Sequence, residues 1–128
     1  MEKVFKELEL VQGKCILPPS PRKMGTYIPI EMKKQTFELD KIDFTDKYTD
    51  SHFSIALQVA LNMCAGGIYL LGFDGYSDDF ETGQKQIKLT RENEYLLEKI
   101  ISTGIPVHSL TQTSYTNINE ISIYQLLG

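Results

Sequence analysis

The pattern of apolar and polar residues is clearest between residues 51 and 65, where it predicts a helix. After Ser51 and His52, this run is apolar except for one polar residue at every fourth position. Residues four apart lie on one helix face, so the helix would carry a narrow polar stripe and bury most of its surface. Asp50 and Ser51 suit its N-cap, and Gly66 or Gly67 suits a left-handed C-terminal stop. The stripe consists of Ser54, Gln58 and Asn62.

A strand, a second helix and a second strand follow. Residues 68–73 are continuously apolar, which predicts a strand covered on both faces, as in a parallel sheet. Thr90 suits the N-cap of a helix over residues 91–103, which Gly104 would end. Residues 105–110 predict the next strand. The apolar stripe of this second helix consists of Leu96, Leu97, Ile100 and Ile101.

The remaining segments carry a weaker pattern. Residues 14–17 predict a short buried strand, and residues 35–40 predict a strand with alternating sides. Residues 2–11 fit either a helix or a strand, and residues 119–127 predict a short helix. The alternation of strands and helices is that of a βαβ unit. We therefore expect an α/β fold, a Rossmann-like three-layer domain with a small, mostly parallel sheet.

Chain length bears on the number of domains. A chain of 128 residues has room for one domain with a single core, so residues 1–128 are expected to form one domain. A doubly wound nucleotide-binding domain opens with a strand and a glycine-rich phosphate loop, and no such motif precedes residues 14–17. Either the domain never had this unit, or the chain is a fragment that begins after it. The fragment interpretation is favoured, with this domain C-terminal in a longer chain.

Charge and cysteine content exclude some partners. The formal net charge of −4 and the isoelectric point near 5.1 disfavour nucleic acid and anionic membrane surfaces. Polar residues interrupt the longest apolar runs, and the N-terminal residues lack the apolar segment of a signal peptide. Cys15 and Cys64 lie among apolar residues and are expected to be reduced core residues. These features favour a cytoplasmic protein without a membrane span.

The expected ligand site lies beyond the carboxyl ends of the two predicted parallel strands. Gly72 and Gly75 would let a backbone or ligand approach closely, and Asp74 would accept hydrogen bonds from a hydroxyl or an amine. Two tyrosines would stack on a base or sugar, and two threonines would bind hydroxyls or phosphate. The candidate ligand-binding residues at this edge are Gly72, Asp74, Gly75, Tyr76, Thr111, Thr113 and Tyr115.

Other interpretations stay open for several of these residues. Asp74 also fits a turn whose backbone N–H groups satisfy the carboxylate. His52 would face the same crevice if its helix pointed the N-terminus there, although Asp50 weakens the field that attracts anions. His108 lies inside a predicted strand and is expected to be a satisfied core or edge residue. Neither histidine has an identifiable Ser or Cys partner, so the catalytic residues stay unassigned.

Two further segments were weighed as binding elements. Asp74, Asp78, Asp79 and Glu81 offer oxygen ligands, but their spacing matches no metal-binding loop, so no metal is predicted here. The loop that carries them spans about fifteen residues, a length typical of lids and binding loops. Residues 18–29 (PPSPRKMGTYIP) are expected to be a surface connection. The alternatives are a proline-rich peptide ligand and an anion contact through basic side chains.

Residues from His52 to Tyr76 resemble a Rossmann-like superfamily that includes small bacterial sialyltransferases and archaeal-type hydroxymethylpterin diphosphokinases. The shared features are an Ala-rich helix, a strand that ends in Gly-x-Asp, and a tyrosine shortly afterwards. Residues 105–115 are similar to the last core strand of that group and its following loop. The resemblance implies a nucleotide or sugar beside Asp74 and Tyr76.

Residues 18–29, 72–76 and 89–96 resemble the C-terminal domain of some bacterial aldolase-like proteins. The N-terminal part of those proteins is similar to the barrel of hydroxymethylglutaryl-CoA lyase and 4-hydroxy-2-oxovalerate aldolase. The resemblance implies that the aldol chemistry and its divalent metal belong to a barrel in the same chain. The present domain would then hold no cofactor and catalyse nothing alone.

The leading expectation is an accessory domain of an aldolase-type lyase. It would bind a sugar-like or nucleotide-like small molecule, or guide assembly into a homo-oligomer. One alternative is part of a glycosyl- or nucleotidyl-transferase-like domain. Another is a protein-interaction module in which the helix over residues 51–65 or the segment over residues 121–127 packs on a partner.

Overall fold

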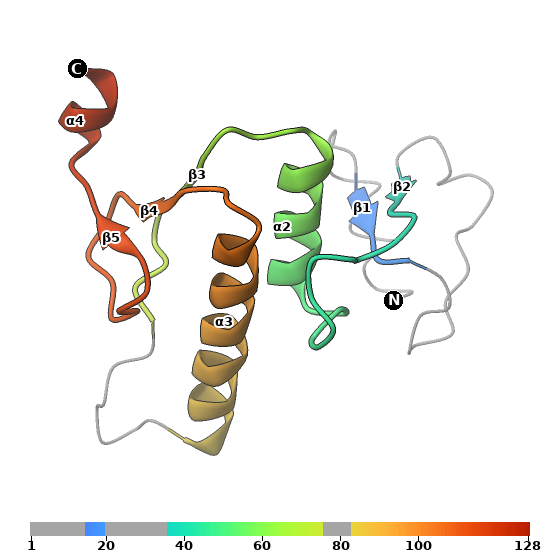
Figure 1. Ribbon diagram of the computed structural model, residues 1–128. Coiled ribbons are helices and arrows are strands. Elements are labelled where there is room, and N and C mark those ends of the chain that lie inside the picture. Colours follow the sequence, from blue (N-terminus) through green and yellow to red (C-terminus); the bar gives the residue numbers. More distant parts are fainter. Residues whose placement is uncertain (1–14, 20–35, 76–82) are drawn as a thin grey trace. The chain divides into compact units, whose positions relative to one another are not determined.

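The computed structural model describes residues 15–19, 36–75 and 83–128 (Figure 1). The chain falls into two compact units, Met1–Val59 and Ala60–Gly128. The expectation for residues 2–11, and most of the expected surface connection over residues 18–29, lie outside the described residues. The described elements form a mixed α/β structure with two small parallel sheets, in agreement with the α/β character that the sequence predicts.

The first unit contains the two N-terminal strands that the sequence predicts. β1 (Cys15–Leu17) pairs in parallel with β2 (Thr36–Glu38), and Ile16 lies opposite Phe37. The Leu39 N–H donates to the Leu17 carbonyl oxygen at 3.0 Å and prolongs the pairing. Leu17 is buried as expected, whereas most of β2 is exposed.

The predicted helix is present as α2 (His52–Asn62), and Ser51 caps it by accepting a hydrogen bond from the Ser54 N–H at 3.0 Å. Two of the three residues of its polar stripe, Ser54 and Gln58, are buried, whereas Asn62 is exposed. The Ser54 hydroxyl donates to the Ser51 carbonyl oxygen at 2.8 Å, and Gln58 Oε1 accepts from the Asp43 N–H at 3.0 Å. These bonds satisfy polar groups that water cannot reach.

The end of α2 differs from the prediction. The left-handed residue after the helix is Cys64, with φ 56°, and neither Gly66 nor Gly67 has a positive φ. The Cys64 N–H donates to the Leu61 carbonyl oxygen at 2.9 Å and so closes the last turn. Both cysteines are reduced, but Cys64 is exposed and Cys15 is half-buried, so the expectation of core cysteines is wrong.

The second unit is built on a three-stranded parallel sheet with strand order β3-β4-β5. β3 (Ile68–Leu70), β4 (Val107–Ser109) and β5 (Asn119–Glu120) are its strands. α3 (Gln84–Ser102) connects β3 to β4, which is the βαβ order that the sequence predicts.

α3 begins before the predicted cap. Thr90 lies inside the helix, where its hydroxyl donates to the Gln86 carbonyl oxygen at 2.9 Å, and Gly83 is the N-cap. Residues 84–89 (QKQIKL) are mostly polar and belong to the predicted loop. They consist mainly of good helix formers, however, and extend the helix toward the N-terminus. Gly104 has φ +96° and ends the helix as expected. The predicted apolar stripe is largely confirmed: Leu96, Leu97 and Ile100 are fully buried and Ile101 is half-buried.

The prediction that residues 68–73 are covered on both faces is wrong. Tyr69 is 44% exposed, and Leu71, which follows β3, is 70% exposed. β3 stands at one end of the described strand order, and an end strand has fewer neighbours to cover it. Continuous apolar sequence cannot by itself distinguish an end strand from a central one.

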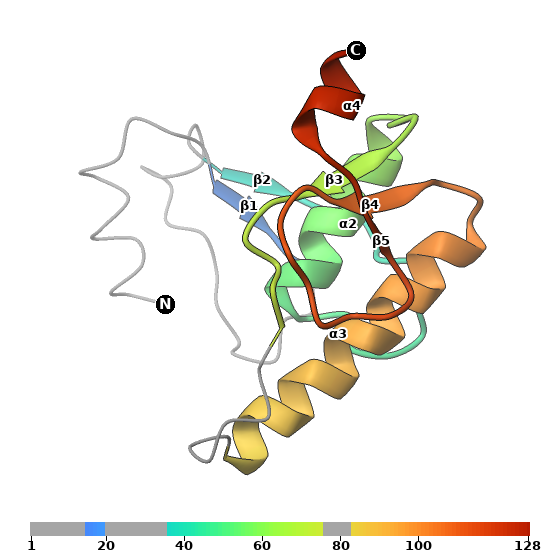
Figure 2. The ribbon, with the colours of Figure 1, turned by 90° about the vertical axis from the view of Figure 1, so that its left-hand side faces the viewer.

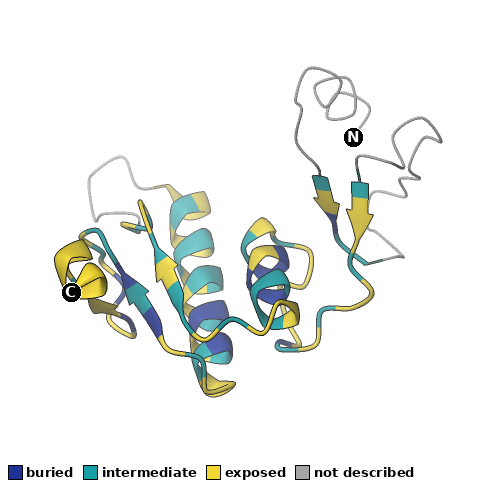
Figure 3. Cartoon of the chain, turned by 90° about the horizontal axis from the view of Figure 1, so that it is seen from above, coloured by how far each residue is buried: buried dark blue, intermediate teal, exposed yellow. Residues whose placement is uncertain are grey.

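The C-terminal segment contains more than the predicted helix. The first two residues of the segment, Asn119–Glu120, form the strand β5. The helix, α4, is confined to Ile123–Leu127. Ser122 opens α4 with a capping box: its hydroxyl accepts from the Tyr124 N–H at 3.1 Å, and Gln125 Oε1 accepts from the Ser122 N–H at 2.9 Å. α4 is exposed along its whole length (Figure 3), and Tyr124 is 81% exposed.

The buried residues of the second unit come from α3, β4 and the connection from β4 to β5. Figure 2 shows this connection passing the middle of α3. Asn93 Nδ2 on the helix donates to the Tyr115 hydroxyl at 3.1 Å, which ties the connection to α3. Within the described part of the chain, no helix has the length and hydropathy needed to cross a membrane.

Candidate ligand-binding edge

The candidate site lies at the carboxyl ends of β3 and β4, where the two strands lead into loops. The Leu110 N–H donates to the Leu70 carbonyl oxygen at 2.9 Å, so the strand pairing continues to the start of both loops. Parallel strands present their carboxyl ends at the same edge of a sheet. Residues 71–75 and 110–115 therefore leave the sheet side by side (Figure 2).

Three hydrogen bonds join the main chain of the first loop to the second loop. The Gly72 N–H donates to Thr111 Oγ1 at 3.0 Å, and Thr113 Oγ1 donates to the Phe73 carbonyl oxygen at 2.8 Å. The Ser114 N–H donates to the Asp74 carbonyl oxygen at 2.7 Å. The structure thus brings together the two segments that the sequence places at one edge.

Asp74 keeps most of its carboxylate available. The side chain is exposed, and its Oδ1 accepts from the Thr111 hydroxyl at 3.4 Å, a long hydrogen bond. Among the described residues, this hydroxyl is the one hydrogen-bond partner of the carboxylate. No backbone N–H group among the described residues bonds this carboxylate, and the N–H groups of residues 76 and 77, which a turn at Asp74 would use, lie outside them.

The two glycines of the first loop serve different purposes. Gly75 has φ +86°, and a Cβ atom there would overlap Ser114 Oγ and lie 3.3 Å from Tyr115 Cε2. The close approach predicted at this glycine is therefore that of the second loop. Gly72 has φ +69° but open space around it, so glycine is favoured there by the backbone conformation alone and not by a close neighbour.

Thr113 and Tyr115 hold the edge together from inside. Tyr115 is 3% exposed, its ring stacks on Phe73 with centroids 5.2 Å apart, and Asn93 binds its hydroxyl. The Thr113 hydroxyl accepts from the Tyr115 N–H at 3.3 Å while it donates to Phe73. The expectation that the Tyr115 ring stacks on a ligand is corrected, because that ring is packed in the core.

The other candidate residues do not join this group. Tyr76 lies outside the described residues, as do Asp78, Asp79 and Glu81. His52 is exposed in the first turn of α2, in the other compact unit, so nothing places it at this edge. Within residues 15–19, 36–75 and 83–128, no three His, Cys, Asp or Glu side chains lie close enough to hold a metal ion.

His108 differs from its expected state. Its ring stacks on Tyr69, with centroids 5.9 Å apart. Its Nδ1 is buried and has no hydrogen-bond partner among the described residues, although the sequence predicted a satisfied histidine. The ring lies inside β4, at the position opposite Tyr69 in the strand pairing, and thus precedes the edge.

Glu120 is a residue of the edge that the sequence analysis missed. It lies on β5, and its Oε1 accepts from the Thr113 N–H at 2.9 Å. The sequence pattern predicts a helix over residues 119–127, and a helix would not place this carboxylate beside the second loop. β5 spans two residues, too few for a periodic signal, so the local sequence does not indicate this strand.

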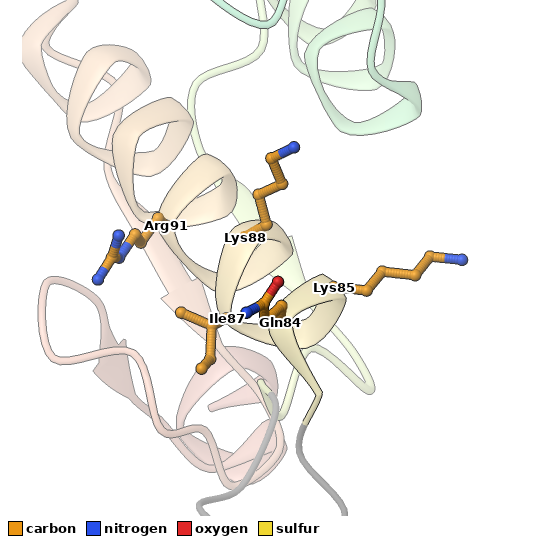
Figure 4. A pocket seen from close by; sticks show the side chains of 5 residues that line it. All are labelled: Gln84, Lys85, Ile87, Lys88 and Arg91. Atoms are coloured by element: carbon orange, nitrogen blue, oxygen red, sulfur yellow. The ribbon is translucent and has the colours of Figure 1, made fainter.

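A hollow of about 530 Å³ lies elsewhere, on the N-terminal half of α3 (Figure 4). Its basic side chains do not converge: Arg91 points to one side of the helix, and Lys85 and Lys88 point to the other. A multiply charged anion needs several donors directed at one point. The hollow therefore lacks the converging donors that a site for a multiply charged anion needs. The hollow is lined by Gln84, Lys85, Ile87, Lys88 and Arg91.

The chain was compared with known proteins in three ways. No model of a protein family, no curated protein and no solved structure matches it. The resemblances to the aldolase-associated domain and to the sialyltransferase superfamily accordingly stay predictions from sequence.

Proposed function

We propose that this chain is a small ligand-binding α/β domain of Rossmann-like type, with its site at the carboxyl edge of β3 and β4. The observation that supports this proposal most is the exposed Asp74 carboxylate beside the Thr111 hydroxyl. Such a pair matches the hydroxyl groups of a sugar or of a ribose, since the carboxylate accepts hydrogen bonds and the remaining lone pair of Thr111 Oγ1 can accept one more.

The fixed loop geometry supports binding at this edge. Three inter-loop hydrogen bonds and the Phe73–Tyr115 stack hold Asp74 in position before a ligand arrives. A preorganised site loses less conformational entropy on binding than a flexible one. No described residue is assigned a bond-making role, so binding is the whole of the proposed activity.

The wider role that we propose is that of an accessory domain in an aldolase-type lyase. It is supported by the sequence resemblance of residues 72–76 and 89–96 to domains that follow an aldolase barrel. The barrel would supply the aldol chemistry and its divalent metal. The reading frame upstream of the chain tests this role, since a phosphate-loop α/β half there would favour the transferase alternative.

Removal of the Asp74 charge is expected to abolish most ligand stabilisation. A probe at a hundred times its Kd stabilises a protein by about 2.7 kcal/mol, and a hydrogen bond to a charged group contributes about 1.5–3 kcal/mol. Thermal unfolding is measured with neutral sugars, sugar phosphates, CMP and UDP. A probe that stabilises the wild-type chain should leave the Asp74→Asn variant almost unchanged.

Glu98→Gln is the matched control, because it removes one exposed carboxylate from α3, away from the edge. Its response to the probe should equal that of the wild-type chain. An Asp74→Asn variant that responds like the wild-type chain would remove Asp74 from the site. If no probe raises the melting temperature, the ligand-binding proposal fails.

Exposed apolar residues favour a second candidate function, self-association. α4 has no buried residue and presents Ile123, Tyr124, Leu126 and Leu127 to solvent. Burial of such side chains at an interface is favourable. Light scattering at high protein concentration tests this function, and a strictly monomeric mass would count against it.

A further inference from the structure

The charges at the edge restrict the chemical class of ligand. The described parts of both loops and β5 carry two carboxylates, Asp74 and Glu120. Residues 66–75 and 106–128 contain no lysine or arginine at all. The field at the edge is therefore negative.

Both carboxylates accept hydrogen bonds from residues of the second loop. Glu120 Oε1 accepts from the Thr113 N–H, and the Thr113 hydroxyl donates to the carbonyl oxygen of Phe73, the residue before Asp74. Both acids are exposed and have acceptor capacity to spare, since a carboxylate offers about four lone-pair sites.

The basic residues of the second unit are all on α3 and do not supply a phosphate clamp at the edge. Lys99 lies over the Tyr95 ring, 5.3 Å from its centroid, and the three others line the diverging hollow of Figure 4. Phosphate groups are bound in proteins by convergent Arg or Lys side chains or by free backbone N–H groups. At the edge, the Gly72, Thr113 and Ser114 N–H groups already have partners within the fold.

We propose that this edge selects ligands that donate hydrogen bonds and carry no negative charge, namely neutral sugars and other polyols, and amino sugars. Sugar phosphates and nucleotides are rejected, because their charge would face the Asp74 and Glu120 carboxylates without a compensating cation from the described residues of the second unit. This selectivity rests on the proposed function and narrows it from a sugar-like or nucleotide-like ligand to the sugar-like class.

Matched pairs of probes test the proposal. Glucose, galactose, N-acetylglucosamine and glucosamine are each compared with a phosphate of the same sugar, and CMP and UDP are added. Binding is followed by the amide NMR signals of the 128-residue chain at 20 mM salt. We expect each sugar to bind roughly tenfold more tightly than its phosphate, and glucosamine to bind at least as tightly as glucose. This difference in affinity should become smaller at 0.5 M salt, because salt screens the repulsion between the phosphate and the carboxylates.

Two variants separate charge from shape. Glu120→Gln retains the Oε1 acceptor for Thr113 but removes the charge, so it should lower the ratio between the affinity of a sugar and that of its phosphate. A sugar phosphate that binds as tightly as its parent sugar, with binding lost in Asp74→Asn, would overturn the selectivity but leave the proposed function standing. Phosphate binding that survives Asp74→Asn and is lost in Lys88→Gln would overturn it in favour of the α3 hollow. If no probe moves the signals of residues 72–75, the proposed function fails and the inference with it.

Discussion

Leu97→Ala is expected to lower the free energy of unfolding by about 2–5 kcal/mol. Leu97 is fully buried on α3, and its truncation removes apolar contacts and leaves a cavity that the surroundings fill only in part. Leu71→Ala, the same substitution at a residue that is 70% exposed, should change the free energy by less than about 0.5 kcal/mol. Denaturant unfolding of both variants measures the difference.

This pair of variants tests where the core lies. Continuous apolar sequence would assign Leu71 to a central strand and predict a large loss there, whereas the structure assigns the large loss to Leu97. Equal losses for the two variants, or a larger loss for Leu71→Ala, would contradict the described packing of the second unit.

Gly75→Ala is expected to cost about 2–5 kcal/mol of stability and to weaken ligand binding as well. An alanine at φ +86° has an unfavourable backbone conformation, worth about 1–2 kcal/mol. Its Cβ would also overlap Ser114 Oγ, and overpacking of this kind adds about 1–3 kcal/mol. Displacement of the second loop would strain the bond from the Ser114 N–H to the Asp74 carbonyl oxygen and so shift the carboxylate.

Gly72→Ala is the matched control for this prediction. It also places alanine at a positive φ, +69°, but its Cβ meets no atom within 4 Å. It should therefore show the backbone cost alone. Ser114→Ala in the Gly75→Ala background should recover part of the loss, because it removes the overlapping atom. Equal costs for the two glycine variants would mean that the loops do not approach each other at Gly75.

Much of the fold was predictable because buried positions are occupied by apolar residues, whose spacing can be recognised in the local sequence. The apolar stripe of Leu96, Leu97, Ile100 and Ile101 identified the core face of α3, and residues 105–110 contain β4. A parallel sheet followed from the order of the elements. These inferences depend on local periodicity, which a single sequence records directly.

Other features depend on contacts between segments far apart in the sequence. Gln58 is polar, yet it is buried because its side chain accepts from the N–H group of Asp43, fifteen residues away. β5 is too short for a clear period and is a strand because it pairs with β4. The exposure of Leu71 reflects the place of β3 at the end of its sheet, which apolar content does not encode.

The same division applies to the candidate site. That Asp74 and Thr111 share one edge followed from the general geometry of parallel strands. That Tyr115 packs inward, against Phe73, while Glu120 reaches the second loop could not be predicted, because both depend on the course of the chain from β4 to β5.

The location of ligand-induced changes tests the central claim most directly. Amide NMR spectra of the chain are recorded with increasing amounts of the neutral sugar that stabilises it most. The account predicts that the largest chemical-shift changes fall on Gly72 to Gly75 and on Thr111 to Ser114, and that Asp74→Asn removes them. Changes confined to residues 84–91 or to the first unit, with these two loops unaffected, would contradict it.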